Sequence, residues 1–373
     1  MKKIIVFLGI SLILSGCNIS DSNNNYEFNT KTIRWSMSKD FEIKDIVEDM
    51  HYILLEETAE SIFSDIYKII IKNERIYILN NRPKDVLVFD IKGKFLHKVG
   101  SRGGGPGEYL PNGIMNFTVD ENDEVFINDY PKGEMMKYDK NGKYVNSYKK
   151  SFSFSDYLLL PDNQFMLSLD IYNKKNLNRK VILTDDLKSI KKSYFHFDKN
   201  YKHNKLNMTV FQPFEDKIAY MRPINDTLFI FDYKGNLEQA WFFDFGNRKL
   251  PEELKNDHEK VIEDRRMGSN SIYIYNTPIC IKNYIFSEIV INSQRGISVY
   301  DTTKNELTHE IIAPENFSLH NINTPLCALS DNLLVSYLDA ETYYYVKDNF
   351  SINPEVDAHL ENGGTIIILN TIR

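Results

Sequence analysis

The chain has 373 residues, of which 42% are apolar and 26% charged, as is typical of a globular protein with a large core or a repeat array. Its 23 Tyr and 23 Phe, against 17 Gly and 12 Pro, favour β-strands, so we expect an all-β fold. The formal charge of −7, which becomes −9 when Lys2 and Lys3 are removed with a signal peptide, argues against nucleic acid and anionic lipid headgroups as partners.

The N-terminus has the features of an export signal. Lys2 and Lys3 precede an apolar run from Ile4 to Leu14, which is too short to remain as a membrane span. The sequence Leu14-Ser15-Gly16-Cys17 follows and resembles the lipobox of bacterial lipoproteins, which implies cleavage before Cys17 and acylation of this residue. The alternative is an ordinary secretory signal followed by a chance cysteine. We predict a signal peptide over 1–16 and a lipidated Cys17 with a polar tether over 17–40. Two or more acyl chains anchor a protein stably in a bilayer.

A strand that ends in an aromatic residue and Asp, followed by a turn, recurs along the chain. The clearest copy is the stretch from Val86 to Gly100, VLVFDIKGKFLHKVG. The aspartate that ends this strand serves as a marker of each copy. The markers are Asp90, Asp139, Asp185, Asp232 and Asp301, with spacings of 49, 46, 47 and 69 residues. A period near 47 with four strands per unit is typical of a β-propeller. The number of residues that remain predicts six four-stranded antiparallel blades over 41–373.

The long last interval contains a stretch with helical features, Pro251 to Met267. Proline stands in its first turn, acidic residues follow early, and Arg265 and Arg266 come late, as the helix dipole favours. We therefore predict one short helical insertion at about 250–268, on the rim of the propeller.

A propeller must close its ring, and either end of the chain could supply the closing strand. The candidates are Thr365 to Leu369 and the early apolar runs around Phe41 to Leu55, and the sequence does not decide between them. Cys280 and Cys327 occupy equivalent places in two repeats, so we expect buried apolar groups and not a disulfide, although their redox state stays open.

Several of these stretches resemble the six-bladed β-propeller lipoproteins of Bacteroidetes, which are similar to NHL-repeat propellers. The resemblance rests on Asp49 to Glu56, on the strand pair from Val86, on the GPGEY loop and on the apolar terminal strand. It covers nearly the whole mature chain and implies architecture and location more than activity. The implied location is the cell envelope, with the anchor in the outer membrane and the periplasmic or surface side left open.

The glycine-rich stretch Ser101 to Tyr109, SRGGGPGEY, does not fit a nucleotide-binding loop. Pro106 stands where a Walker loop needs lysine, and the stretch does not open a helix as a dinucleotide fingerprint does. It is predicted to be a connection between blades whose glycines permit positive φ and close packing. The alternative is that it also presents side chains to a ligand.

Propeller geometry places this connection on the same face as the loops between second and third strands. If a ligand site exists, we expect it on this face. Its candidate ligand-binding residues are Arg82, Arg102, Glu108, Tyr109, Asp129, Tyr130 and Arg222. Arginine forks and aromatic rings suit acidic sugars or an acidic protein surface, whereas for each single residue the alternative is a solvated loop side chain.

No catalytic motif is evident, so no catalytic residue, metal site or cofactor is predicted. His258-Glu259 lacks the second histidine of a zinc-protease helix, and Val125 replaces the glycine that a calcium loop needs. We predict a monomeric propeller that binds a glycan, peptide or partner protein. The alternative is an enzyme centred on the channel, either a metal-dependent hydrolase or a lyase.

Overall fold

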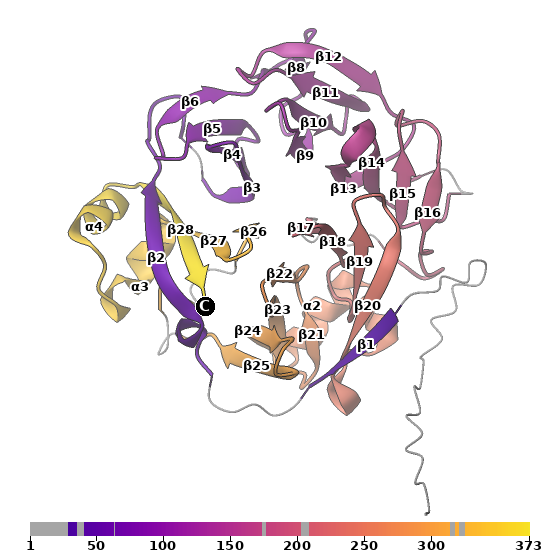
Figure 1. Ribbon diagram of the computed structural model, residues 1–373, viewed down its shortest axis with the longest axis vertical. Coiled ribbons are helices and arrows are strands. Elements are labelled where there is room, and N and C mark those ends of the chain that lie inside the picture. Colours follow the sequence, from indigo (N-terminus) through magenta and orange to yellow (C-terminus); the bar gives the residue numbers. More distant parts are fainter. Residues whose placement is uncertain are drawn as a thin grey trace, which may run out of the picture.

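The computed structural model describes residues 29–35, 41–62, 64–173, 177–202, 209–313, 318–320 and 325–373. These residues form six sheets arranged as blades around a central axis, and a separate two-stranded sheet (Figure 1). The predicted six-bladed propeller is therefore confirmed. Among the described helices, none combines the length and apolar character needed to cross a bilayer.

The first three blades follow one another along the chain, and each contributes four strands from the channel outward. Blade 1 contains β3 (Ile66–Lys72), β4 (Arg75–Asn80), β5 (Val86–Asp90) and β6 (Phe95–Lys98). Blade 2 contains β9 (Ile114–Val119), β10 (Val125–Asp129), β11 (Glu134–Tyr138) and β12 (Tyr144–Lys149). Blade 3 contains β13 (Phe154–Leu159), β14 (Phe165–Leu169), β15 (Val181–Thr184) and β16 (Lys192–Tyr194). The two short strands β7 (Ser101–Arg102) and β8 (Glu108–Tyr109) pair within the glycine-rich connection.

The remaining blades include strands from the N-terminal segment. Blade 4 contains β17 (Phe211–Phe214), β18 (Lys217–Tyr220), β19 (Thr227–Asp232), β20 (Leu237–Asp244) and β1 (Asn29–Arg34). Blade 5 contains β21 (Ile272–Ile274), β22 (Ile279–Ile281), β23 (Tyr284–Ile291), β24 (Gln294–Asp301) and β25 (Glu306–Ile311). Blade 6 contains β26 (Cys327–Ser330), β27 (Leu333–Asp339), β28 (Thr365–Ile372) and β2 (Val47–Leu54).

The second strands show why the sequence folds in this way. Ile76 and Ile78 of β4 belong to the core between blades 6 and 1, whereas Tyr77 and Leu79 belong to the core between blades 1 and 2. All four side chains are fully buried. Alternate side chains point to opposite faces of a strand, so each face of β4 packs against a different neighbouring blade. A continuous apolar run is therefore required in each strand that lies between two neighbouring blades.

The marker aspartates form the turn between the third and fourth strands. Asp90 Oδ1 accepts the backbone N–H groups of Lys92 and Lys94, both at 2.9 Å. Asp139 and Asp232 accept from the equivalent residues of blades 2 and 4. In blade 3 the turn depends on Asp186, one residue after the Asp185 of the sequence pattern, because Asp186 Oδ1 accepts from Lys188 and Ser189.

Ring closure uses both ends of the chain. β2 from the N-terminal segment pairs antiparallel with the C-terminal strand β28, from Val47 opposite Ile372 to Leu54 opposite Ile366. β2 is the outermost strand of blade 6, beyond β28. The N-terminal strand β2 therefore completes the blade that the C-terminal strand β28 belongs to, which the sequence alone did not determine.

The N-terminal segment also adds a fifth strand to blade 4. β1 pairs in parallel with β20, and Ile33 is buried in the core there. This strand lies within the stretch that the sequence analysis assigns to the polar tether. Because only Ile33 of its six residues is buried, β1 lacks the apolar alternation that would have marked it as a strand.

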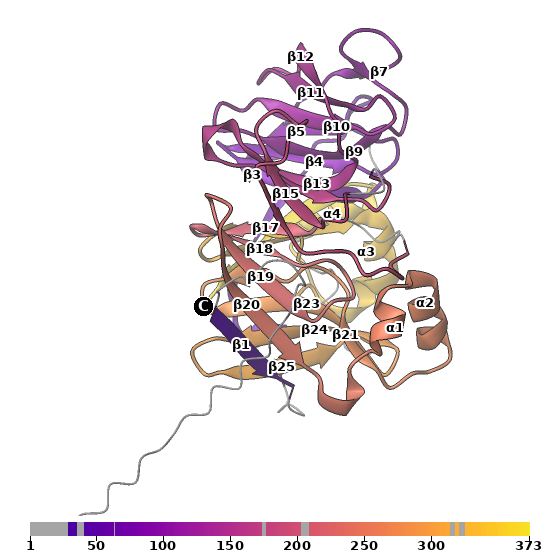
Figure 2. The same ribbon diagram turned by 90° about the vertical axis from the view of Figure 1, so that its right-hand side faces the viewer.

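The connections are unequal on the two faces of the ring. α1 (Glu252–Lys255) and α2 (His258–Arg266) lie between blades 4 and 5, where the sequence predicts a helical insertion. α3 (Ala340–Val346) and α4 (Pro354–Glu361) lie between β27 and β28 and form a second helical insertion. Figure 2 shows all four helices and β7 on one side, and β1 and the C-terminus on the other. We call the side with the helices the loop face.

Candidate functional site

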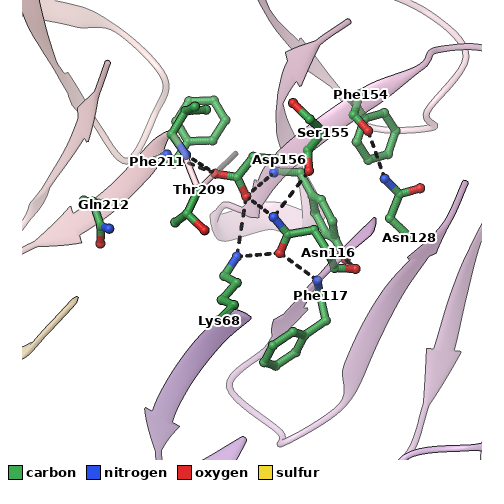
Figure 3. A network of polar contacts seen from close by, with 12 residues as sticks. Lys68, Asn116, Phe117, Asn128, Phe154, Ser155, Asp156, Thr209, Phe211 and Gln212 are labelled. Atoms are coloured by element: carbon green, nitrogen blue, oxygen red, sulfur yellow. Dashed lines mark hydrogen bonds and ion pairs between the residues drawn. The ribbon is translucent and has the colours of Figure 1, made fainter. Parts of the chain in front are cut away.

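Three polar side chains occupy the same position in the innermost strands of the first three blades. Lys68, Asn116 and Asp156 are each the third residue of β3, β9 and β13. The register of each strand shifts at the preceding residue, which has no partner on the neighbouring strand. Bulges of this kind redirect side chains and are frequent near functional sites. They direct these three polar groups toward one another at the channel (Figure 3).

We call Lys68, Asn116 and Asp156 the polar belt. Lys68 Nζ donates to Asn116 Oδ1 at 2.8 Å and lies 3.5 Å from Asp156 Oδ1. Asn116 Nδ2 in turn donates to Asp156 Oδ1 at 2.7 Å. The side chain of Lys68 is 10% exposed and that of Asp156 is 0% exposed, so the ion pair is almost fully removed from bulk water. Such a pair is costly to bury unless its oxygens and protons have partners.

Asp156 obtains those partners from the next blade. Its Oδ2 accepts the backbone N–H groups of Val210 at 2.7 Å and Phe211 at 3.0 Å. Its Oδ1 also accepts the N–H of Tyr157 at 2.9 Å. The polar belt therefore connects the inner strands of blades 1, 2, 3 and 4 through one carboxylate.

A cavity of about 350 Å³ extends along the channel beside the polar belt. Its lining includes residues from Tyr67 to Lys72 of β3, so it follows this strand from one end to the other. The other blades contribute apolar side chains, among them Val119, Leu158, Phe211, Ile279 and Ala328. They also contribute polar ones, which include Thr118, Thr209, Asn276, Thr277 and Ser287. This volume lies within the range of small-molecule binding sites in proteins.

Polar groups stand at both ends of the cavity. Gln212 lies near the polar belt, and its Nε2 donates across the channel to the carbonyl oxygen of Leu326 at 3.3 Å. At the opposite end Lys72 Nζ lies 2.7 Å from Glu121 Oε1. Glu288, which also lines the cavity, lies 2.7 Å from Arg295 Nε. Each charged side chain of the lining thus has an opposite charge close by.

Within the part of the chain that the structure describes, no three His, Cys, Asp or Glu side chains gather closely enough to hold a metal ion. Cys280 and Cys327 are both free thiols, and burial raises the pKa of Cys280 well above its ordinary value. Neither residue therefore has the thiolate character that nucleophilic or metal-ligating cysteines need.

The structure brings Arg102 and Tyr109 together at Asp85, which is 2% exposed. Tyr109 Oη donates to Asp85 Oδ1 at 3.0 Å, and Arg102 Nε lies 3.2 Å from the same oxygen. Burial and the adjacent carboxylate raise the pKa of Tyr109, so its hydroxyl stays a proton donor. Glu108 Oε2 accepts the N–H of Gly105 at 2.8 Å and so stabilises the turn of the glycine-rich connection.

Asp129 and Tyr130 lie side by side but have different surroundings. Asp129 is fully buried and accepts the N–H of Leu110 at 2.9 Å, which fixes the incoming connection. The ring of Tyr130 is 37% exposed, and Lys150 Nζ lies 5.6 Å from its centroid. Burial lowers the pKa of Lys150 to about 8, although Asp129 and Asp170 oppose the shift.

Arg222 and Arg82 are separated from these groups. Arg222 is 5% exposed, and its Nη1 donates to Ser168 Oγ and to the carbonyl oxygen of Leu169, both at 3.1 Å. Arg82 is exposed on the loop between β4 and β5. None of the seven sequence-predicted residues, all of which the structure describes, lines the channel cavity.

The polar belt was not predicted from the sequence, although a signal for it was present. Lys68, Asn116 and Asp156 are polar residues at the third position of the largely apolar runs IYKIII, IMNFTV and FSDYLL. Aligning the repeats by their inner strands, instead of by the marker aspartates, would have placed the three residues at one level. The pairing between them could not be foreseen, because it depends on the bulges.

Comparisons with known proteins give a family but no activity. A family model described as "Domain of unknown function (DUF4934)" matches residues 29–366, and the prokaryotic membrane lipoprotein lipid attachment site matches residues 1–18. A putative exported protein from Bacteroides fragilis NCTC 9343 is similar, with a TM-score of 0.77 at 17% identity over 92% of this chain and 100% of that chain. A member of the duf4221 family from Bacteroides vulgatus ATCC 8482 gives 0.50 at 11% identity over 88% and 97%. Comparison with curated proteins gives no match.

At these identities the solved structures show a shared fold alone. The predicted acylation site, Cys17, lies outside the described residues, but the attachment-site match covers it. The match supports the predicted lipid anchor and places the protein in the cell envelope. The chain belongs to the DUF4934 family, as a lipid-anchored six-bladed propeller of the kind that its resemblance to Bacteroidetes lipoproteins implies.

Proposed function

We propose that this lipoprotein is a binding protein that presents its loop face to a glycan, peptide or partner protein. The observation that carries the proposal is the position of the insertions. Both helical insertions and the glycine-rich connection lie on the loop face, whereas the strand nearest the lipid anchor enters from the other side (Figure 2). Loops positioned by a rigid scaffold are where binding residues concentrate.

The tether supports this orientation. β1 begins at Asn29, opposite Gln239, close to the turn that precedes β20 and away from the loop face. Eleven residues separate Cys17 from Asn29, so the anchor lies at most about 40 Å from the start of the propeller. The attachment to the anchor thus leaves the propeller on the side opposite the helices, away from the loop face.

Exposed side chains on the loop face suit a polar partner with flat surfaces. Tyr344 and Tyr345 of α3 are 72% and 76% exposed, and their rings lie edge to face with centroids 5.6 Å apart. Arg82, Arg102 and Tyr130 of the sequence-predicted set are also exposed. Aromatic rings and arginine forks are the groups that recognise sugars bearing carboxylate or sulfate. The other four residues of that set contribute by holding these loops in place.

The proposal can be tested on a chain that covers 18–373. Binding to an array of uronate-bearing and sulfated oligosaccharides, and to peptides and proteins of the envelope, should be lost in the variant Arg82→Ser, Tyr344→Ser, Tyr345→Ser. A control variant, Lys92→Ser with Lys234→Ser, removes exposed side chains from the turns between third and fourth strands, away from the loop face, and should bind normally. Equal loss in both variants would contradict binding through the loop face.

Two finer points belong to the same proposal. We propose the outer membrane as the site of the anchor, and separation of inner and outer membranes by density should find the protein in the outer fraction. For the enzyme alternative, a metal-dependent hydrolase or a lyase, no specific observation speaks in its favour, and no three His, Cys, Asp or Glu side chains of the described residues gather to hold a metal ion. We therefore do not put it forward as a second function.

A further inference from the structure

We infer that the channel cavity is a second binding site, which takes a small uncharged amphipathic molecule with its polar end at Lys68 and Gln212. Its lining shares no residue with the side chains proposed for the loop face, so it does not depend on the function proposed for that face. Its volume of about 350 Å³ is sufficient for a ligand of modest size.

The middle of the cavity requires an apolar ligand body. Ile70, Leu158, Phe211, Ile279 and Ala328 line it from five different blades. Water in contact with these side chains gains few hydrogen bonds, so its replacement by apolar groups is favourable. A sugar would leave many hydroxyl groups without partners along this part of the channel.

The polar end offers both a donor and an acceptor. Lys68 Nζ has three N–H groups, and its oxygen partners among the described residues are Asn116 and Asp156. The ring of Phe117, 5.9 Å away, is the remaining contact of this ammonium group. Gln212 uses its amide nitrogen on the carbonyl oxygen of Leu326, which leaves its amide oxygen for a ligand donor. A carbonyl or amide group fits between these two side chains.

The absence of a net charge in the lining decides against an ionic ligand. Lys68 is paired with Asp156, Lys72 with Glu121, and Glu288 with Arg295. An anion that entered would compete with Asp156, which already holds five donors and is fully buried. Transfer of an unpaired charge from water into such a site is costly. An uncharged head group avoids this cost.

The first test uses the neutral fluorophore N-phenyl-1-naphthylamine and the chain 18–373. We expect its fluorescence to rise on binding, and we expect decanamide to displace it at about tenfold lower concentration than decanoate. The two competitors have the same alkyl chain and differ in charge. Equal potency, or a stronger effect of decanoate, would overturn the inference, as would the absence of fluorophore binding.

The second test fills the cavity. Ala328→Phe places a ring in the channel and should weaken fluorophore binding at least about tenfold. Ala358→Phe, at an exposed position of α4, is the matched control and should have no effect. Equal weakening in both variants, or none in Ala328→Phe, would place the bound fluorophore elsewhere.

A measurement on the unaltered chain covers the case in which Ala328→Phe does not fold. Cys327 lines the cavity, whereas Cys280 is buried in the core between blades 4 and 5. Burial raises the pKa of Cys327, so alkylation is measured at alkaline pH with iodoacetamide. Decanamide should slow the reaction at Cys327, as followed by peptide mass mapping, and should leave the rate at Cys280 unchanged. An unchanged rate at Cys327 under saturating decanamide would contradict a ligand in the channel.

Discussion

Asp156 Oδ2 accepts the backbone N–H of Phe211 at 3.0 Å, so that a side chain of blade 3 fixes the start of the inner strand of blade 4. Neighbouring blades of a propeller are joined mainly by apolar contacts between sheet faces. The contact between Asp156 and Phe211 is instead directional, and it holds the two strands at a defined height along the channel. The same carboxylate also anchors Lys68 and Asn116 of blades 1 and 2.

Replacing Asp156 should therefore destabilise the whole ring. Asp156→Ala leaves the buried Lys68 ammonium without its counter-charge and removes the acceptor of three backbone N–H groups. Removal of one member of a buried ion pair costs about 3–5 kcal/mol. Urea unfolding should show this decrease in the free energy of unfolding. Asp216→Ala, at a carboxylate that is 80% exposed, is the control and should change stability little. Equal stability of the two variants would show that the polar belt contributes nothing to folding.

Tyr109→Phe tests the hydrogen bond within the glycine-rich connection. The variant keeps the ring in the core but removes the donor to the buried Asp85 carboxylate. A hydrogen bond to a charged group contributes about 1.5–3 kcal/mol, so the midpoint of urea unfolding should fall accordingly. Tyr148→Phe on the exposed strand β12 should behave like the unaltered protein. If Tyr109→Phe does as well, the role of Tyr109 is not structural, and a ligand contact becomes the better explanation for this residue.

Lys150 should make stability depend on pH in the alkaline range. Burial lowers its pKa to about 8 in the folded protein, below the ordinary value of 10.5. Between these two pH values the unfolded chain binds more protons than the folded one, so the free energy of unfolding rises with pH in this window. Below about pH 8 the amine is protonated in both states, and its contribution becomes constant.

Comparison of unfolding free energies at several pH values, for the unaltered chain and for Lys150→Met, isolates this contribution. The difference between the two proteins should change between about pH 8 and 10.5 and be flat below. Other groups titrate in both proteins and cancel. A difference that does not vary with pH would mean that the pKa of Lys150 is not lowered.

Cys17→Ala should release the protein from membranes. The thiol is the attachment point for the lipid, and the apolar run before it is too short to hold the chain by itself. Fractionation should move the variant from the membrane pellet to the soluble fraction. Retention in the pellet with an uncleaved signal would contradict the lipoprotein assignment.

Two truncations separate the roles of the N-terminal strands. A chain that begins at residue 41 lacks β1 but keeps β2, so it should fold with reduced stability because the core around Ile33 is opened. A chain that begins at residue 56 lacks β2 as well, which exposes the edge of β28 and opens the ring, and it should not show a cooperative thermal transition. The chain 18–373 is the reference. Similar melting of the two truncations would show that β2 does not close the ring.

The six-bladed architecture was predictable because short local sequence patterns repeat along the chain. The Asp90 turn and its copies set the period, and the apolar runs set the strands. The second helical insertion was not foreseen, because residues 340–361 carry a strong cap at Asp339 but only a short apolar stripe. β1 was missed for a similar reason, since a strand added in parallel at an outer edge needs only one buried residue.

The candidate site was harder to predict than the fold. The sequence predicted that Arg102 and Tyr109 belong to one connection, but it could not show that they share the buried Asp85. Nor could it show that Arg222 is covered, because burial of a loop residue depends on neighbouring connections. The width of the channel cavity depends on how the inner strands of six blades are placed relative to one another. It therefore cannot be derived from any single stretch of sequence.

The parallel pairing of β1 also determines how the protein carries mechanical load. Tension between the bilayer and the propeller first reaches Asn29 and then acts along β1 toward Arg34. Because the hydrogen bonds to β20 run across this direction, a pull along the strand shears them together and does not peel them one at a time. If β1 yields, β2 still holds the ring shut, and the polypeptide gains length between the membrane and the domain. The N-terminal segment thus joins the anchor to the propeller through a strand whose hydrogen bonds resist a pull along its length together.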